Sequence, residues 1–419
     1  MISKEDNETL TRIEAGSVMG DLMRCYWTPV MLVSEIPEND AAPVRVRVFG
    51  EDLVAFRDSS GRVGLLGEQC PHRAASLALG VNEQGGLRCL YHGWKYGVDG
   101  SCLDIPTESE GSSMCKRVKA KSYPVREAGG MVWAFMGKPE RQPVFPDFEW
   151  FNLPAAQCAA FKVLGECNYA QLLEGAIDTA HAGVLHRRGP WGSKFPGQVW
   201  ENNFRAKLDV EHTAYGFRYA GIRKLDETSS NARVTAVVYP NITLIPSEGG
   251  ISKTRRLVNA FVPRDDESTW VFQFVFDREL PVDVAYRIEE GGLWVDEKFR
   301  KLSNRDNWYR QDRKGNKDGP MSGIRGILVQ DHAVGETQGR ILDRSKEFLG
   351  TSDLAVGMWR RSLLMAARAL HDSGTPPPGT YGNIAFSKIR AEATHLGPNE
   401  SWKTKLPLPE GLVLERESA

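Results

Sequence analysis

The sequence predicts an α+β protein with two domains: a small all-β domain, followed by a larger domain that combines an antiparallel sheet with helices. The first observation is length, since 419 residues exceed the roughly 250–300 at which a single core stops growing. The second is that short alternating stretches dominate two separate regions of the chain. The third is the Pro-containing segment 138–150 between them, which is typical of a linker.

The charge and cysteine content exclude several classes of protein. The 53 Lys and Arg residues balance 54 Asp and Glu, so the chain lacks the basic surplus of a general nucleic-acid binder or membrane-surface protein. The N-terminus is polar, and no run approaches the roughly 18 apolar residues of a membrane-spanning helix, so we expect a cytoplasmic protein. The 7 cysteines are too few and uneven for a disulfide scaffold, and we expect thiols or metal ligands.

The N-terminal elements follow from the periodicity of apolar residues. Residues 1–26 have a helical pattern, and we assign 1–43 to an N-terminal helical segment. From Val44 the pattern changes to alternating stretches such as VRVRVFG, DLVAFRD and MVWAFMG, separated by Gly, Asp and Ser. These stretches predict an antiparallel β domain over 44–145.

The remaining residues, 146–419, are assigned to the second domain. A helix is expected to begin near Asn168, and an apolar-striped helix is expected at 354–371. Between them lie three β-like stretches and a charged helix-and-loop region, and no internal repeat is found. The β-like stretches, which predict a large antiparallel sheet, are 202–222, 232–246 and 255–277.

A four-ligand metal site is predicted in the small domain. The segment CPHRAASLALGVNEQGGLRCLYHGW contains Cys70-x-His72 and, after 16 residues, Cys89-x-x-His92. Two thiolates and two imidazoles suit either a tetrahedral zinc ion or a two-iron two-sulfide cluster with one Cys pair and one His pair. Structural zinc sites usually group their cysteines, whereas each loop here supplies one Cys and one His, which favours the cluster.

A second metal site is indicated by Asp178, His181 and His186. Two imidazoles with one carboxylate form the facial triad of a non-haem Fe(II) oxygenase, although a helix with two satisfied core histidines would give the same pattern. Because five residues turn about 140° around an ideal helix, a shared metal requires the helix to break, which we expect at Ala182 and Gly183. Four residues are candidates for the third ligand: Glu174, Asp331, Glu336 and Asp343.

The motifs CPH and CLYHGW resemble the Rieske iron–sulfur motif. Followed by the Asp178 motif about ninety residues later, they are similar to the Rieske non-haem iron ring-hydroxylating oxygenases over nearly the whole chain. The resemblance implies a Rieske [2Fe-2S] domain, a helix-grip catalytic domain and a mononuclear Fe(II). Because ILVQDHAVGET is similar to the family's segment around the carboxylate ligand, it favours Asp331 as that ligand, with Glu336 five residues on and His332 structural.

The resemblance also implies roles for residues that do not bind iron. In the family, the residue at the position of Asp178 joins a histidine of the mononuclear site to a cluster histidine of the next subunit, which implies a homotrimer or a hexamer of stacked trimers. Asn168 and Gln171 are candidates for supporting the ligands, with helix capping or a surface position as the alternative.

Activity and partners are further implications of the resemblance. Electrons would come from a separate NAD(P)H-dependent reductase, because the chain has no GxGxxG loop or flavin fingerprint. Within the family the chain is similar to the phthalate dioxygenase group, judged by segments 7–30, 89–96 and 330–353. We therefore expect cis-dihydroxylation of an aromatic carboxylate such as phthalate or a substituted benzoate.

The substrate carboxylate would need a cation or polar group in the catalytic cavity. The candidates are Arg205, Arg223, Arg233 and Asn241, and a core role for Asn241 is equally open. Two alternatives remain: a Rieske monooxygenase or O/N-demethylase acting on an aromatic acid, and a non-catalytic electron-transfer or zinc-stabilised binding protein.

Overall fold

A computed structural model describes residues 2–110, 112–187, 203–246, 254–314 and 320–414. The chain forms two compact units. The smaller unit is Arg24–Pro143, and the larger unit combines Met1–Met23 with Val144–Ala419. The N-terminal segment expected over 1–43 is thus shared between the two units, because its first two helices pack with the later helix α8 (Leu354–Ser373).

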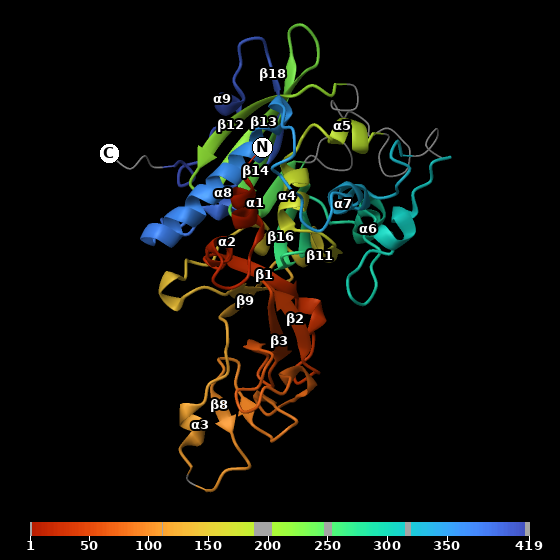
Figure 1. The fold of residues 1–419 in the computed structure, drawn as a ribbon. Coiled ribbons are helices and arrows are strands. Elements are labelled where there is room, and N and C mark those ends of the chain that lie inside the picture. The colour runs from red at the N-terminus through yellow and green to blue at the C-terminus, as the bar shows by residue number, and fades with distance from the viewer. Residues whose placement is uncertain (1, 111, 188–202, 247–253, 315–319, 415–419) are drawn as a thin grey trace. The chain divides into compact units, whose positions relative to one another are not determined.

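The smaller unit is built from short antiparallel strands in three sheets (Figure 1). Their orders are β1-β10-β9, β2-β3-β4 and β5-β6-β7-β8. The strands are β1 (Trp27–Leu32), β2 (Val44–Val48), β3 (Glu51–Arg57), β4 (Val63–Gly67), β5 (Val81–Glu83), β6 (Gly86–Arg88), β7 (Lys95–Tyr96), β8 (Cys102–Asp104), β9 (Val125–Ala128) and β10 (Met131–Phe135). One short helix, α3 (Met114–Arg117), follows β8.

Strand β1 corrects the expectation that residues 1–43 are helical. It pairs antiparallel with β10, and Trp27 lies opposite Phe135. The apolar segment WTPVML gives no clear helical or strand period, so its conformation is decided by a partner about a hundred residues away. Only the first part of the segment is helical, as α1 (Lys4–Thr11) and α2 (Val18–Met23).

The larger unit contains the expected antiparallel sheet, to which the described residues contribute eight strands. Seven strands follow the order β11-β17-β16-β15-β14-β13-β12, and β18 pairs with β14. The strands are β11 (Cys158–Gly165), β12 (Lys207–Thr213), β13 (Gly216–Lys224), β14 (Ser230–Val238), β15 (Ile242–Pro246), β16 (Arg256–Asp265), β17 (Ser268–Phe276) and β18 (Glu392–Leu396). The three β-like stretches of the sequence therefore lie next to one another in one sheet, as predicted.

Helices pack against this sheet and against each other. Helix α4 contacts β15, β16, α7 and α8, and α8 also contacts β12 (Figure 1). Besides α8, the α-helices found after the linker in the described part of the chain are α4 (Tyr169–Ile177), α5 (Ala182–Leu185), α6 (Val284–Gly291), α7 (Ile327–Thr337) and α9 (Trp402–Lys405). No helix among the described residues is both long and apolar enough to cross a membrane.

Candidate metal centres

The four-ligand site of the smaller unit (Cys70, His72, Cys89 and His92) lies on two loops that are closed in the same way. In the first loop the Ala74 N–H donates to Cys70 O at 2.8 Å, and in the second the Gly93 N–H donates to Cys89 O at 3.0 Å. Gly93 has a φ of +76°, and a Cβ there would lie 2.7 Å from Pro106 Cγ, so the second turn requires glycine.

The side chains of the four-ligand site suit a metal cluster. Cys70 and Cys89 are buried, and the ring centroids of His72 and His92 lie 4.5 Å apart. His92 Nδ1 is buried without a hydrogen-bond partner among the described residues, and a metal ion would provide that partner.

The spacing of the four ligands also bears on the choice between zinc and a cluster. A single zinc ion brings all its ligand atoms within a few ångströms of one another. Among the described residues, however, no group that could hold one ion includes any of the four. Ligands spread over two irons fit this arrangement better than a single zinc ion does.

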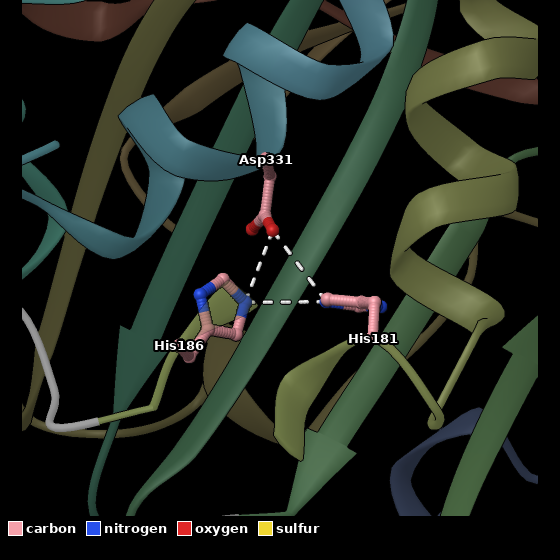
Figure 2. A group of neighbouring side chains, drawn as sticks. All are labelled: His181, His186 and Asp331. Atoms are coloured by element: carbon pink, nitrogen blue, oxygen red, sulfur yellow. Dashed lines mark hydrogen bonds and ion pairs between the residues drawn. The ribbon is translucent and has the colours of Figure 1, made fainter. Parts of the chain in front are cut away.

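Three ligand-type side chains converge in the larger unit, and we call them the metal trio: His181, His186 and Asp331. Their ligand atoms all lie within 4.8 Å of one another. His186 Nε2 lies 3.2 Å from His181 Nε2 and 3.0 Å from Asp331 Oδ1, while His181 Nε2 lies 3.5 Å from the same oxygen (Figure 2). The two imidazoles and one carboxylate point toward a common position, as a non-haem iron site requires.

The helix that leads to the two histidines breaks earlier than expected. Helix α4 ends at Ile177, and α5 begins at Ala182, so the break precedes His181 instead of falling at Ala182 and Gly183. Asp178 causes this break, since its backbone is extended and its carboxylate accepts the Ala180 N–H at 2.7 Å. A new turn then starts at His181, which lets the short helix α5 bring His186 back to face it.

Asp178 also lies beside the ring of His181. Its Oδ2 is 3.4 Å from His181 Nδ1, an ion-pair distance that lacks the alignment of a hydrogen bond. Burial opposes ionisation of this carboxyl, but the His181 ring and the backbone N–H donors outweigh it and lower its pKa. The Asp178 side chain remains 25% exposed, so part of it is open to a further contact.

The charges of the metal trio are complementary. Burial lowers the pKa of His181, but Asp178 and Asp331 outweigh burial and leave the pKa above its ordinary value. Burial raises the pKa of Asp331, and the charges of His186 and His181 outweigh it, so this pKa is lowered. His181 therefore binds a proton more readily beside the ionised Asp331, and a divalent cation would take the place of that proton.

Gln330 is a neighbour of the metal trio that the sequence did not single out. Its Oε1 lies 2.7 Å from His186 Nδ1, and its Nε2 donates to Ile324 O at 2.7 Å. Both contacts are buried. The only signal in the sequence was its position directly before Asp331, which does not reveal a partner 144 residues earlier.

Asn168 and Gln171 hold α4 in place. The Asn168 carboxamide caps α4 by accepting the Ala170 N–H and also donates to Thr11 O and Asp266 O. Gln171 Nε2 donates to the carbonyls of Gly335 and Gly339 at the end of α7. Asn168 therefore caps the helix, whereas Gln171 ties α4 to the helix that carries Asp331.

The other carboxylates considered as ligands have other partners. Glu174 accepts hydrogen bonds from Arg344 and Arg360, and Glu336 accepts from Lys301 and Tyr309. Asp343 accepts from Ser345 and pairs with Lys346 at the surface. His332 is buried beside Glu336, at 3.3 Å.

The candidate substrate residues lie in different surroundings. Arg223 is buried and donates to Thr179 O and Asn203 O, so it holds the loop before His181. Asn241 donates to Phe261 O between strands.

Arg205 and Arg233 differ from these two. Arg205 is exposed and lines an open groove of about 700 Å³. Arg233 lies on β14, and its positive charge acts to lower the pKa of His181. The charge of Arg233 therefore acts on a member of the metal trio.

Two family matches cover most of the chain. Residues 26–124 match the Rieske [2Fe-2S] domain, and residues 134–404 match a family described as "LigXa C-terminal domain like". The first match contains the four-ligand site, and the second contains the metal trio.

Individual proteins are similar over nearly the full length. The phthalate 4,5-dioxygenase oxygenase subunit of Pseudomonas putida is 39% identical over 96% of this chain and 94% of its own length. The 5,5'-dehydrodivanillate O-demethylase oxygenase subunit of Sphingobium sp. (strain NBRC 103272 / SYK-6) is 32% identical over 93% of this chain and 85% of its own length. A solved structure of the Pseudomonas putida CBB5 NdmA QL mutant with theobromine has a TM-score of 0.62 at 18% identity, covering 92% of this chain and 100% of that one, which shows a shared fold.

Proposed function

The chain belongs to the Rieske non-haem iron oxygenases, as an oxygenase alpha subunit, and from this premise we propose that it cis-dihydroxylates an aromatic carboxylate. The observation that carries the proposal is the convergence of His181, His186 and Asp331. Three ligands on one side of a metal leave positions for O₂ and for the approach of substrate. A bound Fe(II) would supply the redox chemistry with O₂ at those positions.

The chain's own residues prepare this site for iron. Asp331 is held ionised by the facing histidines, and Gln330 holds His186 with its Nε2 toward the metal position. Asp178 orients His181 from the opposite side of the ring. Such outer contacts fix the direction of each ligand before the metal binds.

Electrons reach the mononuclear site in two steps in this proposal: a reductase reduces the cluster, and Asp178 passes the electron on to the iron. We infer that Asp178 connects His181 to a cluster histidine of a neighbouring subunit in a homotrimer or a hexamer of stacked trimers. Its partly exposed carboxylate supports this role, because it lies 3.4 Å from His181 Nδ1 and can still accept an imidazole N–H from the neighbouring subunit. A separate NAD(P)H-dependent reductase would load the cluster, since the sequence contains no nicotinamide or flavin fingerprint.

The substrate carboxylate is assigned to Arg233. Register places Arg233 opposite Gly221 and Thr235 opposite Tyr219, so Arg233 and Tyr219 project from the same face of the sheet. Tyr219 donates to Ile177 O at the end of α4, which places this face beneath the helix that leads to His181. A guanidinium there matches a planar carboxylate, and the similarity to the phthalate 4,5-dioxygenase subunit supports an aromatic acid.

Monooxygenation or demethylation of an aromatic acid is the second candidate. The similarity to an O-demethylase oxygenase subunit favours it, and the same metal trio would serve either reaction. The two reactions differ in how many atoms of O₂ enter the ring.

The test supplies the iron-loaded protein with a surrogate reductase and isotope-labelled O₂, and screens aromatic carboxylates. We expect a cis-dihydrodiol with both oxygens labelled, and we expect Arg233→Met to raise KM at least tenfold while Arg205→Met does not. One labelled oxygen, or release of formaldehyde, would assign the protein to the second candidate. An unchanged KM in Arg233→Met would remove Arg233 from the substrate site.

A further inference from the structure

Two thiols of the smaller unit lie in contact outside the four-ligand site. Cys102 belongs to β8 and Cys115 to α3, and the helix packs against the strand. Cys115 Sγ donates to Cys102 O at 3.0 Å, and Cys102 Sγ donates to Asp104 O at 3.8 Å, so the Cys115 thiol lies against the backbone of Cys102. Both residues are half-buried, so a small solute can reach them.

This pair differs from the other cysteines in its surroundings. Cys70 and Cys89 are the thiol ligands of the four-ligand site. Cys25 is buried just before β1, and Cys158 begins β11 whereas Cys167 lies two residues beyond the end of that strand. Neither Cys102 nor Cys115 belongs to the four-ligand site, although both pack against the core cluster that contains Cys70 and Cys89.

We propose that Cys102 and Cys115 are a site of reversible disulfide formation by hydrogen peroxide. Peroxide first oxidises the Cys115 thiol to a sulfenic acid and releases water. The Cys102 sulfur then attacks the sulfenic sulfur, the S–S bond forms, and the hydroxyl leaves as a second water with the Cys102 proton. In sum, one peroxide is reduced to two waters while two thiols are oxidised to one disulfide.

The local chemistry favours a stable disulfide once it has formed. Burial, and then the neighbouring Cys115, raise the pKa of Cys102 to about 12. Ionisation of Cys102 therefore does not stabilise the reduced form, in contrast to thiols whose low pKa makes their disulfides easy to reduce. The same high pKa makes Cys102 slow toward free peroxide, so the first oxidation is assigned to Cys115. Its contact with Cys115 then holds Cys102 beside the sulfenic sulfur that it attacks.

The disulfide would clamp the segment that packs on the second metal loop. The residues between the two cysteines include Pro106, which contacts the turn at Gly93, next to His92. A bond between β8 and α3 closes this segment into a loop and limits its opening. The oxidised protein should therefore release its [2Fe-2S] cluster several-fold more slowly under a chelator than the reduced protein does.

The first measurement is mass spectrometry on the full-length holoprotein after treatment with hydrogen peroxide. Tryptic peptide 96–116 contains both cysteines and no other. We expect this peptide to lose two hydrogens and to resist alkylation, and dithiothreitol should restore two alkylatable thiols. Cys158→Ser is the matched control and should behave as the wild type does, whereas Cys115→Ser should not form the product.

The decisive result comes from the wild-type protein, so it does not depend on whether a variant folds. Peptide 96–116 from treated wild type that still takes up two alkyl groups would overturn it, as would oxidation of either cysteine only to a sulfinic acid. Cluster absorbance followed under chelator tests the clamp separately. Equal rates of cluster loss in oxidised wild type and in Cys115→Ser would refute the clamp.

Discussion

Gln330 accepts a hydrogen bond from His186 Nδ1 at 2.7 Å and so fixes which nitrogen of that ring is available to a metal. The amide orientation follows from its other contact, because Gln330 Nε2 donates to Ile324 O and leaves Oε1 as the acceptor. His186 Nδ1 must then carry the proton, and Nε2 keeps its lone pair toward Asp331 and His181. His181 is oriented differently, by the carboxylate of Asp178.

Gln330→Leu should weaken mononuclear iron binding by about 10- to 100-fold, the usual cost of removing an outer hydrogen bond from a ligand. The cluster should keep its absorbance, because the four-ligand site lies in the other unit. Competitive chelator titration measures the iron affinity. Gln311→Leu is the matched control, since Gln311 also donates from its side chain to a carbonyl, Ser322 O. An iron affinity that falls equally in both variants would show a general loss of folding instead.

Asp178→Asn should lower turnover by at least about 100-fold while leaving cluster absorbance and iron content in place. An Asn oxygen can still accept the Ala180 N–H, so the break before His181 is kept, but the carboxylate that would connect two imidazoles is lost. Asp343→Asn, at the surface beside Lys346, is the control. Unchanged turnover in Asp178→Asn would refute the proposed electron route.

Tyr96→Phe should lower the reduction potential of the cluster by roughly 40 mV, the equivalent of about 1 kcal/mol for one electron. The Tyr96 hydroxyl lies 3.4 Å from Cys70 Sγ. Burial and the neighbouring Cys70 raise the pKa of Tyr96, so the hydroxyl keeps its proton and can donate to a thiolate. Such a bond favours the more negative, reduced cluster. Redox titration of the cluster measures the shift, and Tyr381→Phe, at an exposed tyrosine, is the control. An equal reduction potential in wild type and Tyr96→Phe would contradict a hydrogen bond from Tyr96 to the Cys70 thiolate.

Glu174→Gln should destabilise the larger unit by about 3–5 kcal/mol at pH 7, because it leaves Arg344 and Arg360 buried without their shared carboxylate. Burial opposes ionisation of Glu174, but the two arginines outweigh it and lower its pKa. The stabilisation is therefore full above the unfolded pKa of about 4.3 and is lost as the pH falls through the lower folded value. Urea titrations at several pH values measure the difference. The surface pair of Glu8 and Arg12 provides the control Glu8→Gln, expected to cost less than about 1 kcal/mol.

The sequence predicted the features that depend on nearby residues. Cys70, His72, Cys89 and His92 lie within two short motifs, and each motif is a loop closed by its own backbone. The alternating stretches predicted strands because each strand has its period within a few residues.

The features that the sequence could not predict depend on distant partners. Strand β1 exists because Trp27–Leu32 pairs with β10, and the role of Arg223 comes from its contact with Thr179. Gln330 reaches His186 because α7 packs against α4, a packing to which the hydrogen bond of Gln171 contributes. The sequence suggested a helix break at Ala182 and Gly183, but the break lies at Asp178. The Asp178 carboxylate accepts the backbone N–H groups of Ala180 and His181, and helical spacing alone does not show these contacts.

The iron and sulfide content of wild type and of Asp331→Ala tests the central claim most directly, because it asks whether the metal trio holds its own iron apart from the cluster. We predict about three iron atoms and about two acid-labile sulfides per wild-type chain. In Asp331→Ala we predict about two of each, with unchanged cluster absorbance. A variant that kept a third iron, or a wild-type chain that bound only the iron of its cluster, would contradict the assignment of His181, His186 and Asp331.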